Sequence, residues 1–128
     1  MIDLLYIRDE ETHPEGSIIF EEGGFSDWVY VILEGEVKVS KNTPRGQVTV
    51  AKLGEGDFIG ELEFLDMGKE PRSATVSAVG EVKLGVVDRD KLRREYDSLS
   101  PDFRKIIRTL VQRLRRITIQ AAALASSR

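Results

Sequence analysis

The periodicity of the apolar residues changes near residue 88, and this change limits the folds open to the chain. Before it, short runs rich in Val, Ile and aromatic residues recur about every 8–12 residues, as in antiparallel sandwiches and barrels. After it, the apolar positions follow helical spacing. A length of 128 residues suits one domain with one core. We expect a single domain over 1–128: a mainly β fold with C-terminal α, built as an antiparallel β-roll or jelly-roll barrel over about 12–88 and followed by helices.

Six short segments have the composition of strands. They span residues 17–20, 28–33, 36–40, 47–53, 73–79 and 82–87. Glu34-Gly35 is predicted to form a turn between the second and third segments, and the stretch 42–46 is typical of a hairpin loop. The segments on either side of that loop alternate polar and apolar residues, which predicts strands with one exposed face.

Two helices are predicted in the last third of the chain. Asp88 is a suitable N-cap for a short helix over about 89–97, and Ser100 followed by Pro101 marks the start of a longer one over about 101–124. Apolar residues at alternating spacings of four and three form a heptad seam on the longer helix. The seam consists of Phe103, Ile107, Leu110, Leu114, Ile117, Ala121 and Leu124, and Ile106 and Val111 widen it. Such a helix buries its seam on the β body, on a second copy of itself, or on both.

The residue types that are missing argue against several kinds of chemistry. The chain has no cysteine, which excludes disulfides, thiolate nucleophiles and cysteine-ligated metal sites and is compatible with the cytosol. His13 is its one histidine and has no ligand cluster or Ser–His–Asp grouping around it, which argues against a barrel-shaped metalloenzyme. No apolar run reaches the roughly 18 residues of a membrane span, and no signal peptide is evident. We expect a cytoplasmic protein that is not an enzyme, holds no metal and makes no membrane contact.

The segment 53–65, with the sequence LGEGDFIGELEFL, has the features of an anion site. Its glycines allow close approach of the backbone to a ligand, and residues 61–65 can form one helical turn whose N–H groups favour an anion. The guanidinium of Arg72 can clamp phosphate oxygens, while the Glu61 carboxylate can accept hydrogen bonds from sugar hydroxyls. The residues alone leave a second interpretation open, in which Glu61 and Arg72 pair with each other and tie a loop to a strand.

Several motifs in a fixed order carry a family resemblance. They are Gly16 before 18–20, Glu22-Gly23, the segments 30–32 and 35–37, GDFIGEL at 56–62 and RSATV at 72–76. Together they resemble the cyclic nucleotide-binding domain family, which includes bacterial catabolite activator proteins and regulatory subunits of cAMP-dependent protein kinase. The similarity covers roughly residues 12–124, and the stretch around Glu61 and Arg72 looks like the phosphate-binding cassette of that family. The resemblance implies a β-roll with a short cassette helix and a long C-terminal helix.

The resemblance also implies roles for individual residues. Glu61 would accept the ribose 2′-hydroxyl, and Arg72 would bind the cyclic phosphate with help from backbone N–H groups of residues 60–63. The C-terminal helix acts as a lid over the base in this family, so Leu114, Ile117 and Thr118 are candidates there, although Thr118 is equally an ordinary solvated helix residue. The implied nucleotide site comprises Ile59, Gly60, Glu61, Leu62, Glu63, Arg72, Ser73, Ala74 and Thr118.

Two features depart from the best-known ligand-binding members of the family. Residue 63 is Glu where those members carry Ala or Gly, and the loop 66–70 is longer. A second carboxylate near a bound phosphate costs Coulomb energy unless it points to water. We expect a regulatory module that binds cAMP, ahead of cGMP, and signals through movement of its C-terminal helix. The alternative is a degenerate cyclic nucleotide-binding fold that binds no nucleotide and serves as a protein-interaction module.

Charge is distributed unevenly along the chain. Residues 1–90 carry 9 basic and 19 acidic side chains, whereas residues 91–128 carry 10 basic and 3 acidic ones. A basic tail can contact nucleic acid or an acidic partner, but the simpler explanation is a solvated helix face, to which Arg113, Arg115 and Arg116 are assigned. Because no helix-turn-helix follows the last residue, we expect no direct DNA binding, but a homodimer through the C-terminal helix and a protein effector.

Overall fold

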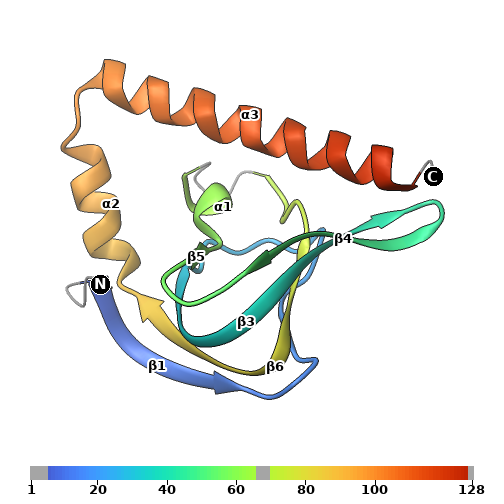
Figure 1. The fold of residues 1–128 in the computed structure, drawn as a ribbon. Coiled ribbons are helices and arrows are strands. Elements are labelled where there is room, and N and C mark those ends of the chain that lie inside the picture. The colour runs from blue at the N-terminus through green and yellow to red at the C-terminus, as the bar shows by residue number, and fades with distance from the viewer. Residues whose placement is uncertain (1–5, 66–69, 127–128) are drawn as a thin grey trace.

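The computed structural model describes residues 6–65 and 70–126 of the chain (Figure 1). In chain order its elements are β1 (Ile7–His13), β2 (Ile18–Phe20), β3 (Tyr30–Thr43), β4 (Gly46–Leu53), β5 (Phe58–Ile59), α1 (Glu61–Leu65), β6 (Thr75–Val87), α2 (Arg89–Asp97) and α3 (Pro101–Ser126). The change from strands to helices falls at Asp88, where the apolar periodicity changes. A curled sheet thus forms the body, and α2 and α3 follow it.

All strand pairs in the sheet are antiparallel. The strand order is β1-β6-β3-β4, with β2 added to β6 and β5 added to β3. β6 is a central strand of the sheet and pairs with β1, β2 and β3. The order ends at β1 and at β4, so the sheet is an open roll rather than a closed barrel (Figure 1). The expected mainly β roll with a short helix and a long C-terminal helix is confirmed.

The two longest strands continue through positions where the sequence suggests breaks. The predicted strands before and after Gly35 form one strand, β3, and those before and after Gly80 form β6. Gly35 has a φ of 92°, and the register between β3 and β6 shifts around it, which is a β-bulge. A Cβ on Gly35 would lie 2.6 Å from the carbonyl oxygen of Glu81, so only glycine fits there. The predicted turn at Glu34-Gly35 is therefore wrong, because this glycine bends a paired strand without ending it.

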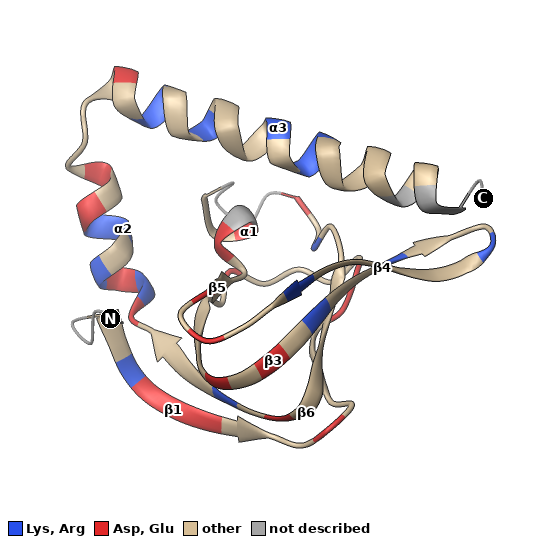
Figure 2. Cartoon of the chain, viewed as in Figure 1, with Lys and Arg blue, Asp and Glu red and all other residues tan. Residues whose placement is uncertain are grey.

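β1 has no counterpart among the predicted strands. Its sequence, IRDEETH, contains four consecutive charged residues and lacks the apolar alternation of a half-buried strand. It pairs with β6 along its whole length and forms an edge of the sheet. An edge strand tolerates charged side chains because they remain in water. Figure 2 shows the resulting acidic stretch on β1.

A small apolar cluster holds α1 in place. The main core lies inside the roll and consists of Phe20, Ile32, Val37, Ile59, Val76, Ala78, Val82 and Leu84. Phe64 of α1 packs instead with Val29 and Val87, and all three side chains are buried. Full burial of a Phe side chain contributes about 1.5–3 kcal/mol. A helix of five residues has little stability of its own, so this cluster fixes its position on the roll.

Both C-terminal helices begin at the predicted caps. The Asp88 carboxylate accepts a hydrogen bond from the Lys91 N–H, and the Ser100 hydroxyl oxygen accepts one from the Phe103 N–H. α3 then passes over α1 and contacts α1, β3 and β4 (Figure 1).

α3 rests on the roll with a face other than its predicted seam. The body-facing stripe consists of Arg104, Ile107, Val111, Arg115 and Thr118, each of which is buried or half-buried. The exposed large apolar residues of the helix are Phe103, Ile106, Leu110, Leu114, Ile117, Ile119 and Leu124. Most of the heptad seam therefore faces away from the roll. Lys and Arg residues are spread along α2 and α3 (Figure 2).

Candidate functional site

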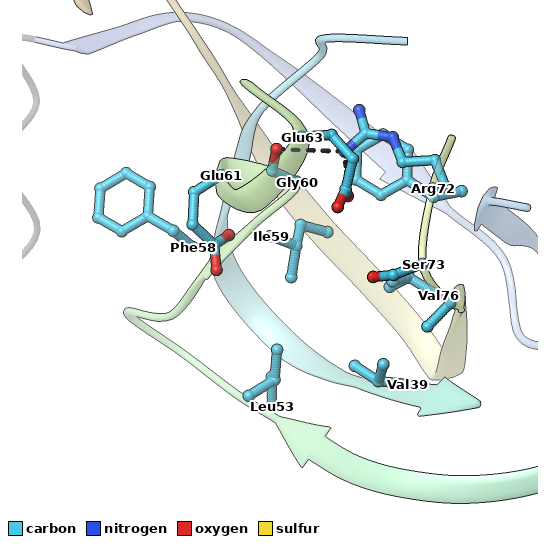
Figure 3. A pocket seen from close by; sticks show the side chains of 12 residues that line it. Val39, Leu53, Phe58, Ile59, Gly60, Glu61, Glu63, Arg72, Ser73 and Val76 are labelled. Atoms are coloured by element: carbon cyan, nitrogen blue, oxygen red, sulfur yellow. Dashed lines mark hydrogen bonds and ion pairs between the residues drawn. The ribbon is translucent and has the colours of Figure 1, made fainter. Parts of the chain in front are cut away.

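A pocket of about 90 Å³ lies where α1 and β5 meet the start of β6. Its lining residues are Phe20, Val39, Leu53, Phe58, Ile59, Gly60, Glu61, Glu63, Arg72, Ser73, Ala74 and Val76. Figure 3 shows Arg72 and Glu63 together at one end and Val39 and Leu53 at the other. The pocket thus has a charged end beside α1 and an apolar end beside β3 and β4.

Gly60 allows α1 to begin directly against the strands. Its φ is 88°, a conformation that residues with a side chain rarely adopt. A Cβ there would lie 2.4 Å from the Trp28 carbonyl oxygen and 2.8 Å from the Phe20 ring. The glycine is therefore required both by its backbone conformation and by the close approach of its neighbours.

Arg72 is buried at the charged end, with a side chain that is 2% exposed. Its Nη1 donates to Glu63 Oε1 over 2.9 Å and to the Gly60 carbonyl oxygen over 3.1 Å. Its Nη2 donates to Ser26 Oγ and to the Trp28 carbonyl oxygen, both over 2.8 Å. These acceptors come from two separate segments of the chain, so the guanidinium holds the loop 26–28 and the start of α1 together.

The remaining polar atom of this guanidinium lacks an acceptor. Arg72 Nε is buried without a hydrogen-bond partner among residues 6–65 and 70–126. The Phe20 ring lies against the guanidinium, with its centroid 3.8 Å from Arg72 Cζ, which is a cation–π contact. A buried donor without an acceptor costs about 1–3 kcal/mol, and an entering acceptor would remove that cost.

Glu61 lines the same pocket with a half-buried carboxylate. Burial raises the pKa of this carboxyl above its ordinary value of 4.5, and the nearby Glu63 carboxylate raises it further, whereas Arg72 lowers it. Its Oε2 is buried without a hydrogen-bond partner in the described part of the chain. Of the interpretations that the sequence left open, pairing of Glu61 with Arg72 is not what the structure has, because Arg72 forms its ion pair with Glu63.

Glu63 connects the pocket to α3. Its Oε2 accepts a hydrogen bond of 3.2 Å from Arg115 Nη2, while its Oε1 holds Arg72. Arg115 also donates through Nη1 to the Pro71 carbonyl oxygen over 3.1 Å, and its side chain is only 16% exposed. The assignment of Arg115 to the solvated face is therefore wrong. It lies on the body-facing stripe one turn after Val111, a spacing that could have indicated this position.

The structure brings seven of the nine predicted site residues to one pocket: Ile59, Gly60, Glu61, Glu63, Arg72, Ser73 and Ala74. Their roles toward a nucleotide stay predictions. The side chain of Leu62 lies outside what the structure describes, as do residues 66–69 of the longer loop. Thr118 is not among the lining residues, and its hydroxyl donates to the Leu114 carbonyl oxygen within α3. The sequence had not singled out the apolar lining residues Phe20, Val39, Leu53 and Val76.

Comparison with known sequences identifies relatives of two kinds. The profile of the cyclic nucleotide-binding domain matches residues 10–98. The CRP-like cAMP-activated global transcriptional regulator of Mycobacterium tuberculosis is 34% identical over 104 residues, which cover 80% of this chain and 46% of the relative. A cAMP-dependent protein kinase regulatory subunit of Aspergillus fumigatus is 38% identical over 86 residues, which cover 67% of this chain and 20% of the relative. The chain spans less than half the length of these relatives.

Solved structures give the same result. The cAMP-bound form of the EAL enzyme Bd1971 superposes with a TM-score of 0.81 at 29% identity, over 90% of this chain and 30% of that one. Its cGMP-bound form superposes with a TM-score of 0.77 at 28% identity, over 84% of this chain and 28% of that one. Both similarities extend over most of this chain.

Two further properties concern metals and membranes. Within residues 6–65 and 70–126, no group of three or more His, Asp or Glu side chains is placed to hold a metal ion. In the same part of the chain, no helix has the length and apolar character needed to cross a membrane.

The profile match over more than half of the chain, together with relatives above 30% identity, shows that the chain belongs to the cyclic nucleotide-binding domain family, whose domains are regulatory.

Proposed function

We propose that this chain is a non-enzymatic, cytosolic regulatory domain that binds a cyclic mononucleotide in the pocket between α1 and β6. One observation carries the proposal. Arg72 and Glu61 line one pocket, and each has a buried polar atom without a partner among the described residues: the donor Nε of Arg72 and the acceptor Oε2 of Glu61. A ribose cyclic phosphate supplies an anionic acceptor and a hydroxyl donor side by side, which is the complement of this pair.

The two ends of the pocket suit the two ends of such a ligand. The cyclic phosphate would lie at the charged end, where Arg72 can donate to its oxygens, and the 2′-hydroxyl would donate to Glu61. Ser73 and the backbone N–H groups of residues 60–63 would add donors. The base would lie toward Val39 and Leu53, which form the apolar end (Figure 3). A hydroxyl at residue 73 is compatible with either purine ring.

We place cAMP ahead of cGMP as the ligand. The Mycobacterium tuberculosis relative is a cAMP-activated regulator, and the Aspergillus relative belongs to a cAMP-dependent kinase. The EAL enzyme Bd1971 is known in both a cAMP-bound and a cGMP-bound form, which keeps cGMP as the second candidate.

Binding would be passed on through α3 to a second copy of the chain and to a protein effector rather than to DNA. α3 contacts α1 and β4, both of which contribute residues to the pocket. A ligand that shifts α1 would therefore change the surface that supports α3 and move the population between two helix positions. The seam that faces away from the roll offers an apolar surface for pairing two copies of α3. Thr118 does not line the pocket, so we propose that it reaches the base only after α3 has moved.

Isothermal titration calorimetry with cAMP and cGMP tests the proposal, with 5′-AMP as the control for the cyclic phosphate. We expect micromolar or tighter binding of cAMP, no binding of 5′-AMP, and loss of binding in Arg72→Lys, because lysine cannot present a bidentate donor pair. Glu61→Gln should weaken binding about tenfold, and Glu55→Gln, an exposed control, should leave it unchanged. No binding of either cyclic nucleotide up to millimolar concentration would contradict the proposal.

A second candidate function is favoured by one contact. Arg72 is already paired with Glu63, so the fold is complete without a ligand and could serve as a protein-interaction module. This alternative predicts that cAMP leaves the free energy of unfolding unchanged. A binder at 100-fold excess over its Kd gains about 2.7 kcal/mol. Urea unfolding with and without cAMP separates the two functions.

A further inference from the structure

Glu63 lies between two arginines, Arg72 in the segment before β6 and Arg115 on α3. Oε1 accepts from Arg72 Nη1 over 2.9 Å, and Oε2 accepts from Arg115 Nη2 over 3.2 Å. The Glu63 side chain is 7% exposed, so its charge is compensated by these contacts rather than by water. A single carboxylate thus joins α1, the start of β6 and α3.

We infer that Glu63 is an intrachain substitute for the ligand's phosphate, which sets the affinity of the pocket and links its occupancy to the attachment of α3. The inference rests on the proposed function. A carboxylate and a phosphate each present two anionic oxygens that can accept hydrogen bonds from a guanidinium. They therefore compete for the same N–H donors. Glu63 engages one of the donor nitrogens of Arg72 that an entering phosphate would need.

The charge of the pocket supports competition rather than joint occupancy. The lining contains two carboxylates, Glu61 and Glu63, and one cation, Arg72. A phosphate that bound Arg72 beside Glu63 would lie close to a second negative charge. There is little water in this region to screen the repulsion. This repulsion favours the departure of Glu63 from Arg72 when a phosphate binds, so the nucleotide and the ion pair compete for the guanidinium.

The same departure loosens α3. Arg115 donates to Glu63 Oε2 and to the Pro71 carbonyl oxygen, and both acceptors lie close in sequence to Arg72. Val111, one turn earlier, is the buried apolar contact of this part of the helix. When Glu63 turns away, Arg115 loses its ion pair with Glu63 Oε2, while its hydrogen bond to the Pro71 carbonyl oxygen does not depend on Glu63. Ligand entry and release of this part of α3 are then one event.

Nucleotide titration of Glu63→Gln tests the competition. Gln has the same shape without the charge, so we expect cAMP to bind at least about tenfold more tightly than to the wild type. Glu55→Gln is the matched control and should leave the affinity unchanged. Equal affinity of the wild type and Glu63→Gln would overturn the competition while leaving the proposed function intact. Binding by Glu63→Gln alone would confirm the competition and contradict the proposed function for the natural chain. If neither the wild type nor Glu63→Gln binds cAMP, both the competition and the proposed function are wrong.

Hydrogen exchange without nucleotide tests the link to α3 separately. Glu63→Gln and Arg115→Gln should each raise backbone exchange around residue 115 by about tenfold or more, relative to the wild type. Arg116→Gln, on the adjacent exposed position, is the control and should not. Addition of cAMP to the wild type should raise exchange in the same peptides. Unchanged exchange in both Glu63→Gln and Arg115→Gln would overturn the link, whatever the nucleotide titration gives.

Discussion

Glu63 and Arg72 form a buried ion pair, with 2.9 Å between Oε1 and Nη1 and side chains that are 7% and 2% exposed. Desolvation of two charges offsets much of their attraction, so such a pair adds little net stability. Loss of one partner is different, because it leaves a buried charge uncompensated. The pair therefore makes the pocket sensitive to single substitutions at either position.

Removing Arg72 alone should cost more than removing both charges. We expect Arg72→Met to lower the free energy of unfolding by about 3–5 kcal/mol, because Glu63 and three further acceptors lose a buried donor. Arg72→Met combined with Glu63→Leu should recover at least about 1 kcal/mol of this loss. Urea unfolding at 25 °C measures both. A double variant that is less stable than Arg72→Met would show that the pair does not interact in this way.

Gly60 and Gly56 provide a matched comparison. Their φ values are 88° and 90°, but only at Gly60 would a Cβ meet other atoms within 4 Å. Gly56→Ala should cost about 1 kcal/mol for the backbone conformation alone. Gly60→Ala should cost about 2–4 kcal/mol because the methyl group also collides with the Trp28 carbonyl and the Phe20 ring. Equal losses in urea unfolding would contradict this account.

The raised pKa of Glu61 predicts a pH-dependent stability. Because the folded protein favours the protonated carboxyl, the stability that this form contributes is fully present below about pH 4.5 and is lost as the pH rises through the raised pKa. Glu61→Gln cannot ionise, so it should be more stable than the wild type at pH 7. The difference should shrink toward pH 4. A difference that stays constant or grows in acid would refute the assignment.

The exposed seam of α3 predicts a concentration-dependent homodimer. Leu110→Glu places a charge in the middle of the seam and should shift the protein to monomer, with a loss of at least about tenfold in dimer affinity. Gln112→Glu, on an exposed position beside the seam, should leave the dimer unchanged. Analytical ultracentrifugation over a range of concentrations measures both. A wild type that is monomeric at every concentration would exclude the dimer.

The parts of the fold that depend on local pattern could be predicted from the sequence. The change of period at Asp88, the caps at Asp88 and Ser100, and the helical turn after Gly60 were all predicted. β1 was missed because its charged residues are tolerated only at an edge, and sheet edges are set by tertiary pairing. The sequence predicts a turn at Gly35, because it does not show whether a glycine ends a strand or forms a bulge within it.

The candidate site was predictable in part for the same reason. Glu61 and Arg72 belong to short motifs, and both line one pocket as expected. The partner of Arg72 was not predictable, because the choice between Glu61 and Glu63 depends on how one turn of helix is rotated by the burial of Phe64. The contact of Arg115 with Glu63 joins residues 52 positions apart and depends on which face of α3 meets the roll.

β6 connects the pocket segment that carries Arg72 with the helices that follow Asp88. It starts three residues after Arg72 and ends one residue before Asp88. It is hydrogen-bonded to neighbouring strands over its length, so we expect it to resist bending. In the movement of α3 that we propose, rotation relative to the pocket would be concentrated in residues 98–100, between α2 and α3. With 26 residues, α3 is a lever about 39 Å long. A rotation of about 10° there would move the far end of α3 by ~7 Å, so a displacement of one side chain at the pocket would become a much larger movement at the end of the helix.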